Sequence, residues 1–234
     1  MTRRLARELG VVGGPAGGLL VLMWTVLAGL VLAHVGFRTW RVPADPGYGL
    51  GRDRGYGDVY FTVLVVWVVL MCLLLAVRHR SVLLAAWATA FGVLAVDDWF
   101  GLHERFGVVI GARLGTTSGL GELVWLGGLA LVIGVLLVVG HLRAGGPVRA
   151  TSTLLMVLCA GLFVCGVVVD AVHAAVSGEH WNTVALVVED GGEIAVLCVV
   201  VSFLFAVTFC GHRPAPFAGR WRRLRPAGPG PRPR

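Results

Sequence analysis

Acidic and histidine side chains in the second half of the chain have the types and spacing of a catalytic or metal-binding group. Four stretches carry them: VDDWFGLHE, GELVWL, VVDAVHAAV and VVEDGGEIAV. Carboxyl and imidazole groups transfer protons in acid–base catalysis, and they also ligate zinc and iron. The candidate residues are Asp97, Asp98, His103, Glu104, Glu122, Asp170, His173, Glu189, Asp190 and Glu193.

These stretches lie within or beside apolar runs that are long enough to cross a membrane. The hydrocarbon core requires about 20 apolar residues, and six runs qualify: 17–36, 59–77, 81–102, 120–141, 151–176 and 184–209. The composition is 57% hydrophobic and 14% charged, whereas soluble domains are about 45–50% apolar and about 25% charged. The sequence therefore predicts an all-α, polytopic membrane helical bundle with about six transmembrane helices.

The arginines predict the orientation of this bundle. All 20 basic residues are Arg, and 14 of them precede the first span, fill the second and fourth loops, or lie in the tail. Because positive loops face the cytoplasm, we expect a multi-pass protein of the cell membrane with both termini in the cytoplasm. We expect membrane lipids and no nucleic acid as the partners of the net charge of +7.

The predicted domain organisation is simple. One transmembrane domain covers 1–212, and an Arg- and Pro-rich disordered tail follows over 213–234. The segment 40–58 is rich in Gly and Pro, which indicates an irregular flap on the outer side. A plain connector is the alternative interpretation of this segment.

The predicted topology brings the acidic residues to one depth. Spans three and five run outward with acids near their C-terminal ends, and spans four and six run inward with acids near their N-terminal ends. All eight carboxyl groups are therefore expected in the outer half of the membrane. Asp97 and Glu104 share a helical face if the helix continues through Gly101, and Asp170 and His173 are neighbours at i, i+3.

A cluster of this kind needs a cavity or partners, because one ionisable residue in a span costs about 2.5–3.5 kcal/mol. No Arg lies within these four spans, so some carboxyl groups must be protonated, hydrogen-bonded to His, or bound to a metal. Near the interface, Glu104 and Glu122 have the alternative of reaching water. The aromatic residues at this depth line a substrate or form the interfacial belt; they are Trp99, Phe100, Trp125 and Trp181.

Three kinds of chemistry fit these residues. In the first, a protonated carboxyl group protonates an alkene or epoxide of a lipid-like substrate, His103 or His173 fixes its proton, and a second carboxylate removes one. The second is a zinc or di-iron lipid hydrolase or oxidase. Its metal ligands would be Asp97, His103, Asp170, His173, Glu189 and Glu193. The third is non-catalytic lipid binding or transport, although the apolar inner halves of the spans argue against transport.

The stretches DDWFGLHE, GELVWL, DAVH and EDGGE resemble those of uncharacterised bacterial six-helix membrane proteins. Over residues 81–209 the size, span number and scattered acids are also similar to bacterial membrane-embedded terpene cyclases of meroterpenoid and indole-terpenoid pathways. This resemblance implies cyclisation of a prenyl chain by protonation, without a metal and without loss of diphosphate. The candidate acids are then Asp97, Asp98, Glu104, Asp170, Glu189, Asp190 and Glu193. We expect a membrane enzyme without a cofactor that acts on a hydrophobic or prenylated small molecule, with a Zn or Fe enzyme as the alternative.

Overall fold

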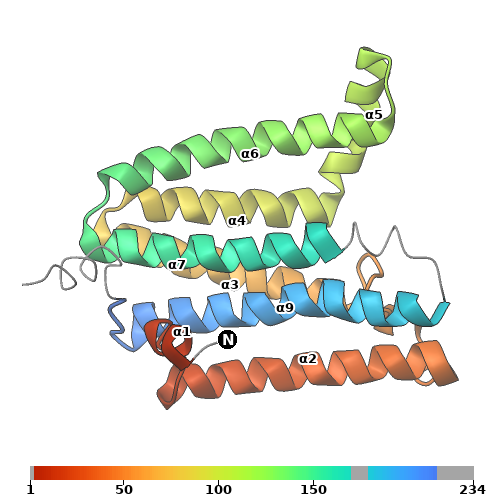
Figure 1. Ribbon diagram of the computed structural model, residues 1–234, viewed down its shortest axis with the longest axis horizontal. Coiled ribbons are helices and arrows are strands. Elements are labelled where there is room, and N and C mark those ends of the chain that lie inside the picture. The colour runs from red at the N-terminus through yellow and green to blue at the C-terminus, as the bar shows by residue number, and fades with distance from the viewer. Residues whose placement is uncertain (1–2, 170–178, 215–234) are drawn as a thin grey trace, which may run out of the picture.

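The computed structural model describes residues 3–169 and 179–214, which form helices and connecting turns without a β-strand (Figure 1). The chain order starts with α1 and α2, the 3-10 turn η1 and α3. It continues with α4, α5 and α6, then α7, the π-helical turn η2 and α9. Their bounds are Arg3–Glu8, Gly14–Trp40, Pro46–Tyr48, Tyr56–His79, Val82–Phe100, Leu102–Leu114, Ser118–Arg143, Gly146–Phe163, Val164–Val169 and Glu179–Phe209.

Six of these helices are long and apolar enough to cross a membrane. They are α2, α3, α4, α6, α7 with its extension to Gly166, and α9 from Thr183. The predicted all-α membrane bundle of about six spans is therefore confirmed. The predicted domain boundary at 212/213 stays a prediction, because residues 215–234 lie outside the described part of the chain.

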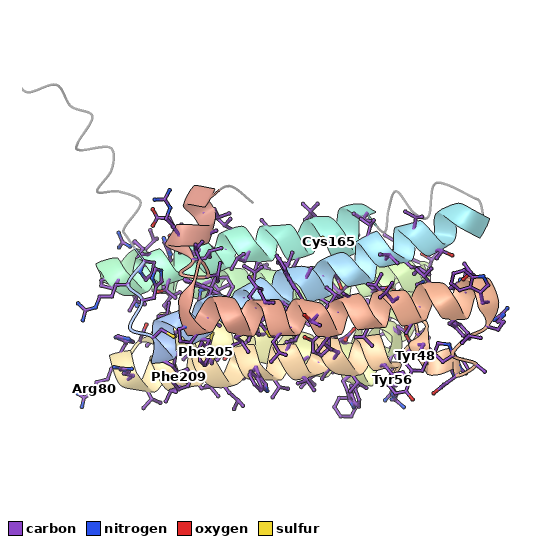
Figure 2. All side chains as sticks on the ribbon, turned by 90° about the horizontal axis from the view of Figure 1, so that it is seen from below. Tyr48, Tyr56, Arg80, Cys165, Phe205 and Phe209 are labelled. Atoms are coloured by element: carbon purple, nitrogen blue, oxygen red, sulfur yellow. The ribbon has the colours of Figure 1, made fainter. Side chains whose placement is uncertain are left out.

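The long helices run side by side and alternate in direction along the long axis (Figure 1). We call one end the acidic end; it holds the segments 41–55 and 101–117 and the start of α9. The opposite end is the basic end, with the turns at 80–81 and 144–145 and the segment 210–214. Figure 2 shows Tyr48 and Tyr56 at the acidic end and Arg80 at the basic end.

Helix α9 forms the centre of the bundle. It packs against α2, α3 and α7, and 61% of its membrane-spanning window is buried, whereas none of the window of α6 is buried. Phe203 and Leu204 of α9 lie in a continuous apolar core with Val68 and Leu155. Helix α6 is thus peripheral, and its apolar side chains are suited to contact with lipid.

The helix predicted over 81–102 ends earlier, at Phe100. Gly101 adopts a left-handed conformation (φ +56°), and its N–H caps the carbonyl groups at the end of α4. Glycine terminates helices in this way because it lacks the Cβ that would strain the left-handed region. The condition under which Asp97 and Glu104 would share one helical face, a helix that continues through Gly101, is therefore not met.

After this turn the chain forms α5, which was not among the predicted helices, and the start of α6 then packs back along α5. The two backbones approach closely because three glycines face one another. A Cβ on Gly121 would collide with the carbonyl oxygen of Gly107 and lie 2.7 Å from the nitrogen of Gly111. A side chain at Gly107, Gly111 or Gly121 would thus force α5 and α6 apart.

The segment 41–55 is an ordered cap and not a plain connector. His34 of α2 is 1% exposed, and its Nδ1 accepts the N–H of Leu50 at 3.0 Å. The carboxylate of Asp45 accepts the N–H of Gly47 and the hydroxyl of Tyr56, both at 2.8 Å. The segment is therefore fixed to both α2 and the start of α3.

Candidate functional site

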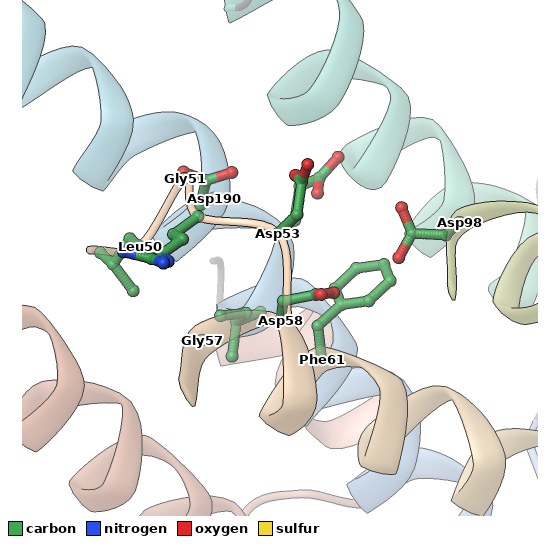
Figure 3. A pocket seen from close by; sticks show the side chains of 11 residues that line it. Leu50, Gly51, Asp53, Gly57, Asp58, Phe61, Asp98 and Asp190 are labelled. Carbon is green, nitrogen blue, oxygen red and sulfur yellow. The ribbon is translucent and has the colours of Figure 1, made fainter. Parts of the chain in front are cut away.

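A cavity of about 160 Å³ lies at the acidic end, under the 41–55 segment (Figure 3). Helices α3, α4 and α9 and the segment itself each contribute to its wall. The apolar part of the wall includes Leu50, Phe61 and Ile194. Its acidic residues are Asp53, Asp58, Asp98, Asp190 and Glu193.

The five acids reach the cavity from separate parts of the fold. Asp58 lies in the first turn of α3, and its carboxylate accepts the N–H of Arg54 at 2.6 Å. Asp98 lies in the last turn of α4, and Figure 3 shows it across the ring of Phe61 from Asp58. Only one cation, Arg52, lines this cavity among the described residues. Mutual repulsion is relieved when carboxyl groups share protons or bind a cation.

Glu193 is held against an unusual helical turn. The continuation of α7 over Val164–Val169 is π-helical. This conformation is rare in proteins overall, but where it occurs it is often at a functional site. A Cβ on Gly166 in this turn would collide with the Glu193 carboxylate. A Cβ on Gly192 would similarly lie 2.9 Å from the sulfur of Cys165. Glycine at 166 therefore permits the position of Glu193.

A second recess of about 500 Å³ adjoins the cavity and shares Asp53, Asp58 and Asp98 with it. Its wall also includes Trp99, Phe100 and His103, which were predicted to line a substrate, and the predicted acid Glu104. Arg54 and Arg105 lie in the same wall, so this recess carries both signs of charge. Asp98 is thus the predicted acid that borders both spaces.

Asp97 has a different environment from its neighbour Asp98. It is 7% exposed and lines neither space. Its Oδ1 accepts the indole N–H of Trp125 at 3.0 Å, and its Oδ2 lies 2.9 Å from Nδ1 of His103. The ring of Trp125 stacks on Phe106 at 4.1 Å. Asp97 therefore orients His103 at the edge of the second recess and joins α4, α5 and α6.

Several expected site residues lie elsewhere. Glu122 packs over Gly107 in the α5–α6 hairpin, and Glu189 lies on α9 without lining either space. Asp170 and His173 lie outside the described residues, and nothing is described for the side chain of Trp181. The described part of the chain contains no group of three or more His, Cys, Asp or Glu residues placed to hold a metal ion. The metal-ligand set that includes Asp170 and His173 stays a prediction.

Sequence reasoning missed Asp53 and Asp58. Both precede or begin the second span, on the same side of the predicted topology as the other acids. That shared side was the available signal. They reach the cavity because the 41–55 segment folds onto His34. No local sequence pattern predicts this contact.

Comparison with known proteins places the chain in one family. The family profile matches residues 18–208, a stretch that reaches from the first candidate span to the last. The chain belongs to the DUF8692 family, a domain of unknown function. No curated protein and no solved structure matches the chain. The DUF8692 match covers all of the residues described here around the acidic cavity.

Proposed function

We propose that this DUF8692 protein is a membrane enzyme that protonates an isoprenoid substrate at the acidic end and thereby starts its cyclisation, without a metal. The observation that carries this proposal is the cavity with five carboxyl groups and one arginine. Crowded carboxyl groups retain protons more readily than isolated ones, which is the property a proton donor needs. The adjoining recess, about 500 Å³, falls in the range of small-molecule sites, about 300–1,000 Å³, and the cavity of about 160 Å³ opens beside it.

The residues of the two spaces divide into three roles. Asp98 borders both spaces, which suits a proton donor, and the aromatic rings of Phe61, Trp99 and Phe100 lie in the same walls. Ring faces attract positive charge, so these side chains are suited to a carbocation intermediate. Glu193, which also lines the cavity, is suited to accept the final proton.

The proposed reaction balances without a co-reactant. The Asp98 carboxyl group gives its proton to an alkene carbon or an epoxide oxygen, and the π electrons of a second alkene form the new ring bond. A carboxylate then removes a proton from a carbon beside the cation, which creates an alkene. The product is an isomer of the substrate; the second carboxyl group then releases its proton to water, and the donor takes up a proton from water.

Product analysis with matched variants tests the proposal. Purified protein is incubated with C15 and C20 prenylated phenols and their terminal epoxides, and products are separated by liquid chromatography with mass detection. We expect cyclised isomers from the wild type, and we expect Asp98→Asn and Glu193→Gln to lose turnover. Asp45→Asn is the control, because Asp45 is an acid at the same end that lines neither space.

Two results would overturn the proposal. Unchanged turnover in Asp98→Asn would show that Asp98 is not the proton donor. Stoichiometric zinc or iron in the wild type, absent from Glu193→Gln, would instead favour the metal-dependent hydrolase or oxidase.

We also propose that the acidic end faces away from the cytoplasm. The arginines in or beside the two short turns at the basic end, including Arg78, Arg80, Arg143 and Arg149, support this orientation. In intact cells a membrane-impermeant thiol reagent should label Asp45→Cys and not Arg80→Cys. The reverse pattern would invert the orientation.

A further inference from the structure

A second cavity, of about 610 Å³, lies at the basic end of the bundle. It is bordered by the last turns of α3 and α9, the first turn of α7 and the segment after α9. The acidic cavity lies at the opposite end, so no residue is common to the two. This cavity is therefore separate from the site of the function proposed above.

The charged side chains of this cavity have one sign. They are Arg78 and Arg213, the histidines His79 and His212 line the same wall, and none of the described lining residues is an Asp or Glu. Arg78 donates from Nη1 to the carbonyl oxygen of Thr208 at 3.2 Å. Because a guanidinium has five N–H donors, this bond fixes the side chain and leaves donors for a ligand.

The start of α7 adds further positive potential. Pro147 and Val148 of its first turn line the cavity. Its N-cap, Gly145, supplies no side-chain hydrogen bond to the free N–H groups of that turn. The N-terminus of this 18-residue helix attracts anions through the helix dipole and the N–H of Val148, since Pro147 has no N–H.

Thr208 gives an independent indication of a polar ligand. Thr208 lines the cavity and is 5% exposed, and among the described residues its buried hydroxyl has no hydrogen-bond partner. Thr151, which lines the same cavity, uses its hydroxyl within α7, where it donates to the carbonyl oxygen of Pro147 at 3.2 Å. Buried hydroxyls are normally hydrogen-bonded, so the Thr208 hydroxyl is suited to donate to an anion.

The segment that carries Arg213 is fixed in place. The Nε2 of His212 lies 2.7 Å from the carbonyl oxygen of Glu8, and its ring packs on Gly10. The N–H of His212 also donates to the carbonyl oxygen of Ala206 at 3.0 Å. Arg213 therefore follows directly from an anchored residue at the cavity.

We propose that the basic-end cavity binds a phosphate ester, with Arg78, Arg213 and the Thr208 hydroxyl as its ligands. Apolar residues complete the wall, including Leu75, Leu84 and Phe209. A phospholipid supplies both an anionic headgroup and an acyl chain, so the cavity matches an anionic phospholipid. The chain's own tail is a poor match, because residues 213–234 contain no Asp or Glu side chain.

Titration calorimetry on the full-length protein in detergent tests this proposal. The probes are dihexanoyl phosphatidic acid, dihexanoyl phosphatidylcholine and inorganic phosphate. We expect the phosphatidic acid to bind best. We expect Arg78→Gln to weaken its binding about tenfold through the loss of a charge-assisted hydrogen bond, and Thr208→Val to weaken it about fivefold.

Arg80→Gln is the matched control, because Arg80 is at the same end and does not line the cavity. Arg213→Gln serves if Arg78→Gln fails to fold, since the Arg213 side chain is exposed. Inorganic phosphate that binds as tightly as phosphatidic acid would keep the site and identify free phosphate as its ligand. Equal binding of phosphatidylcholine, or equal losses in Arg80→Gln and Arg78→Gln, would overturn the proposal.

Discussion

The contact between Asp97 and His103 gives a prediction that can be worked out in energetic detail. Asp97 is buried and uses both carboxyl oxygens, one for Trp125 and one for His103. Asp97→Asn preserves the shape and one acceptor oxygen, which can still accept the Trp125 N–H. The other position becomes an amide NH2, which cannot accept a hydrogen bond from the imidazole.

The expected cost follows from the two bonds. A hydrogen bond to a charged group contributes about 1.5–3 kcal/mol, and a neutral one about 0.5–1.5 kcal/mol. Loss of the His103 bond and weakening of the Trp125 bond should therefore lower the free energy of unfolding by about 2–3 kcal/mol. His103→Gln should cost less, about 1 kcal/mol, because its side chain is 29% exposed.

A double-mutant cycle measures the coupling. The free energy of unfolding is measured by SDS titration in mixed micelles for Asp97→Asn, His103→Gln and the double variant. We expect a coupling energy of about 1–2 kcal/mol, as for other residues in direct contact. His141→Gln is the control, because His141 contacts Ser152 at the basic end and should be additive with Asp97→Asn. Additivity of Asp97→Asn and His103→Gln within about 0.3 kcal/mol would refute the pairing.

Three further predictions concern the hairpin, the π-helical turn and the 41–55 segment. Gly121→Ala should lower the free energy of unfolding by about 1–3 kcal/mol through overpacking of α5 on α6. The control Gly127→Ala, whose Cβ would meet open space, should not lower it. Equal thermal stability of the two variants would contradict the close packing. Gly166→Ala should displace Glu193 and reduce turnover about 100-fold. The control Gly161→Ala, whose Cβ would make an ordinary 3.6 Å contact with Val196, should keep the turnover of the wild type. An active Gly166→Ala variant would show that the position of Glu193 is not required. The hydrogen bonds from Gly47 and Tyr56 hold the pKa of Asp45 below its usual value. The stability that these bonds provide should therefore be complete above the ordinary aspartate pKa, about 3.9. It should be lost as the pH falls through the lowered pKa. Amide hydrogen exchange at Gly47 should therefore accelerate in acid in the wild type and stay independent of pH, after correction for intrinsic exchange, in Asp45→Asn; the same acceleration in both would contradict this.

Much of the fold could be predicted because it depends on local composition. Six apolar runs of membrane-spanning length translate directly into six long helices. The alternating direction of those helices also explains why acids at the end of α4 and the start of α9 lie at one end of the bundle.

The details of the site depend on contacts between distant residues. Gly101 is compatible with both a continued and an ended helix, and the close packing of Gly107 and Gly121 decides where the chain goes afterwards. Similarly, Asp53 and Asp58 line the cavity because the Leu50 N–H binds His34 from 16 residues earlier. These contacts join residues far apart in the chain, so no local hydrophobic pattern predicts them.

Solvent-deuterium incorporation tests the central claim most directly. If a carboxyl group of the acidic cavity protonates the substrate, turnover in D2O should give a cyclised product with one deuterium on carbon for an alkene substrate. Asp98→Asn should give no such product, and Asp45→Asn should give it as the wild type does. A cyclised product without deuterium, or equal incorporation by Asp98→Asn and the wild type, would contradict protonation by this cavity.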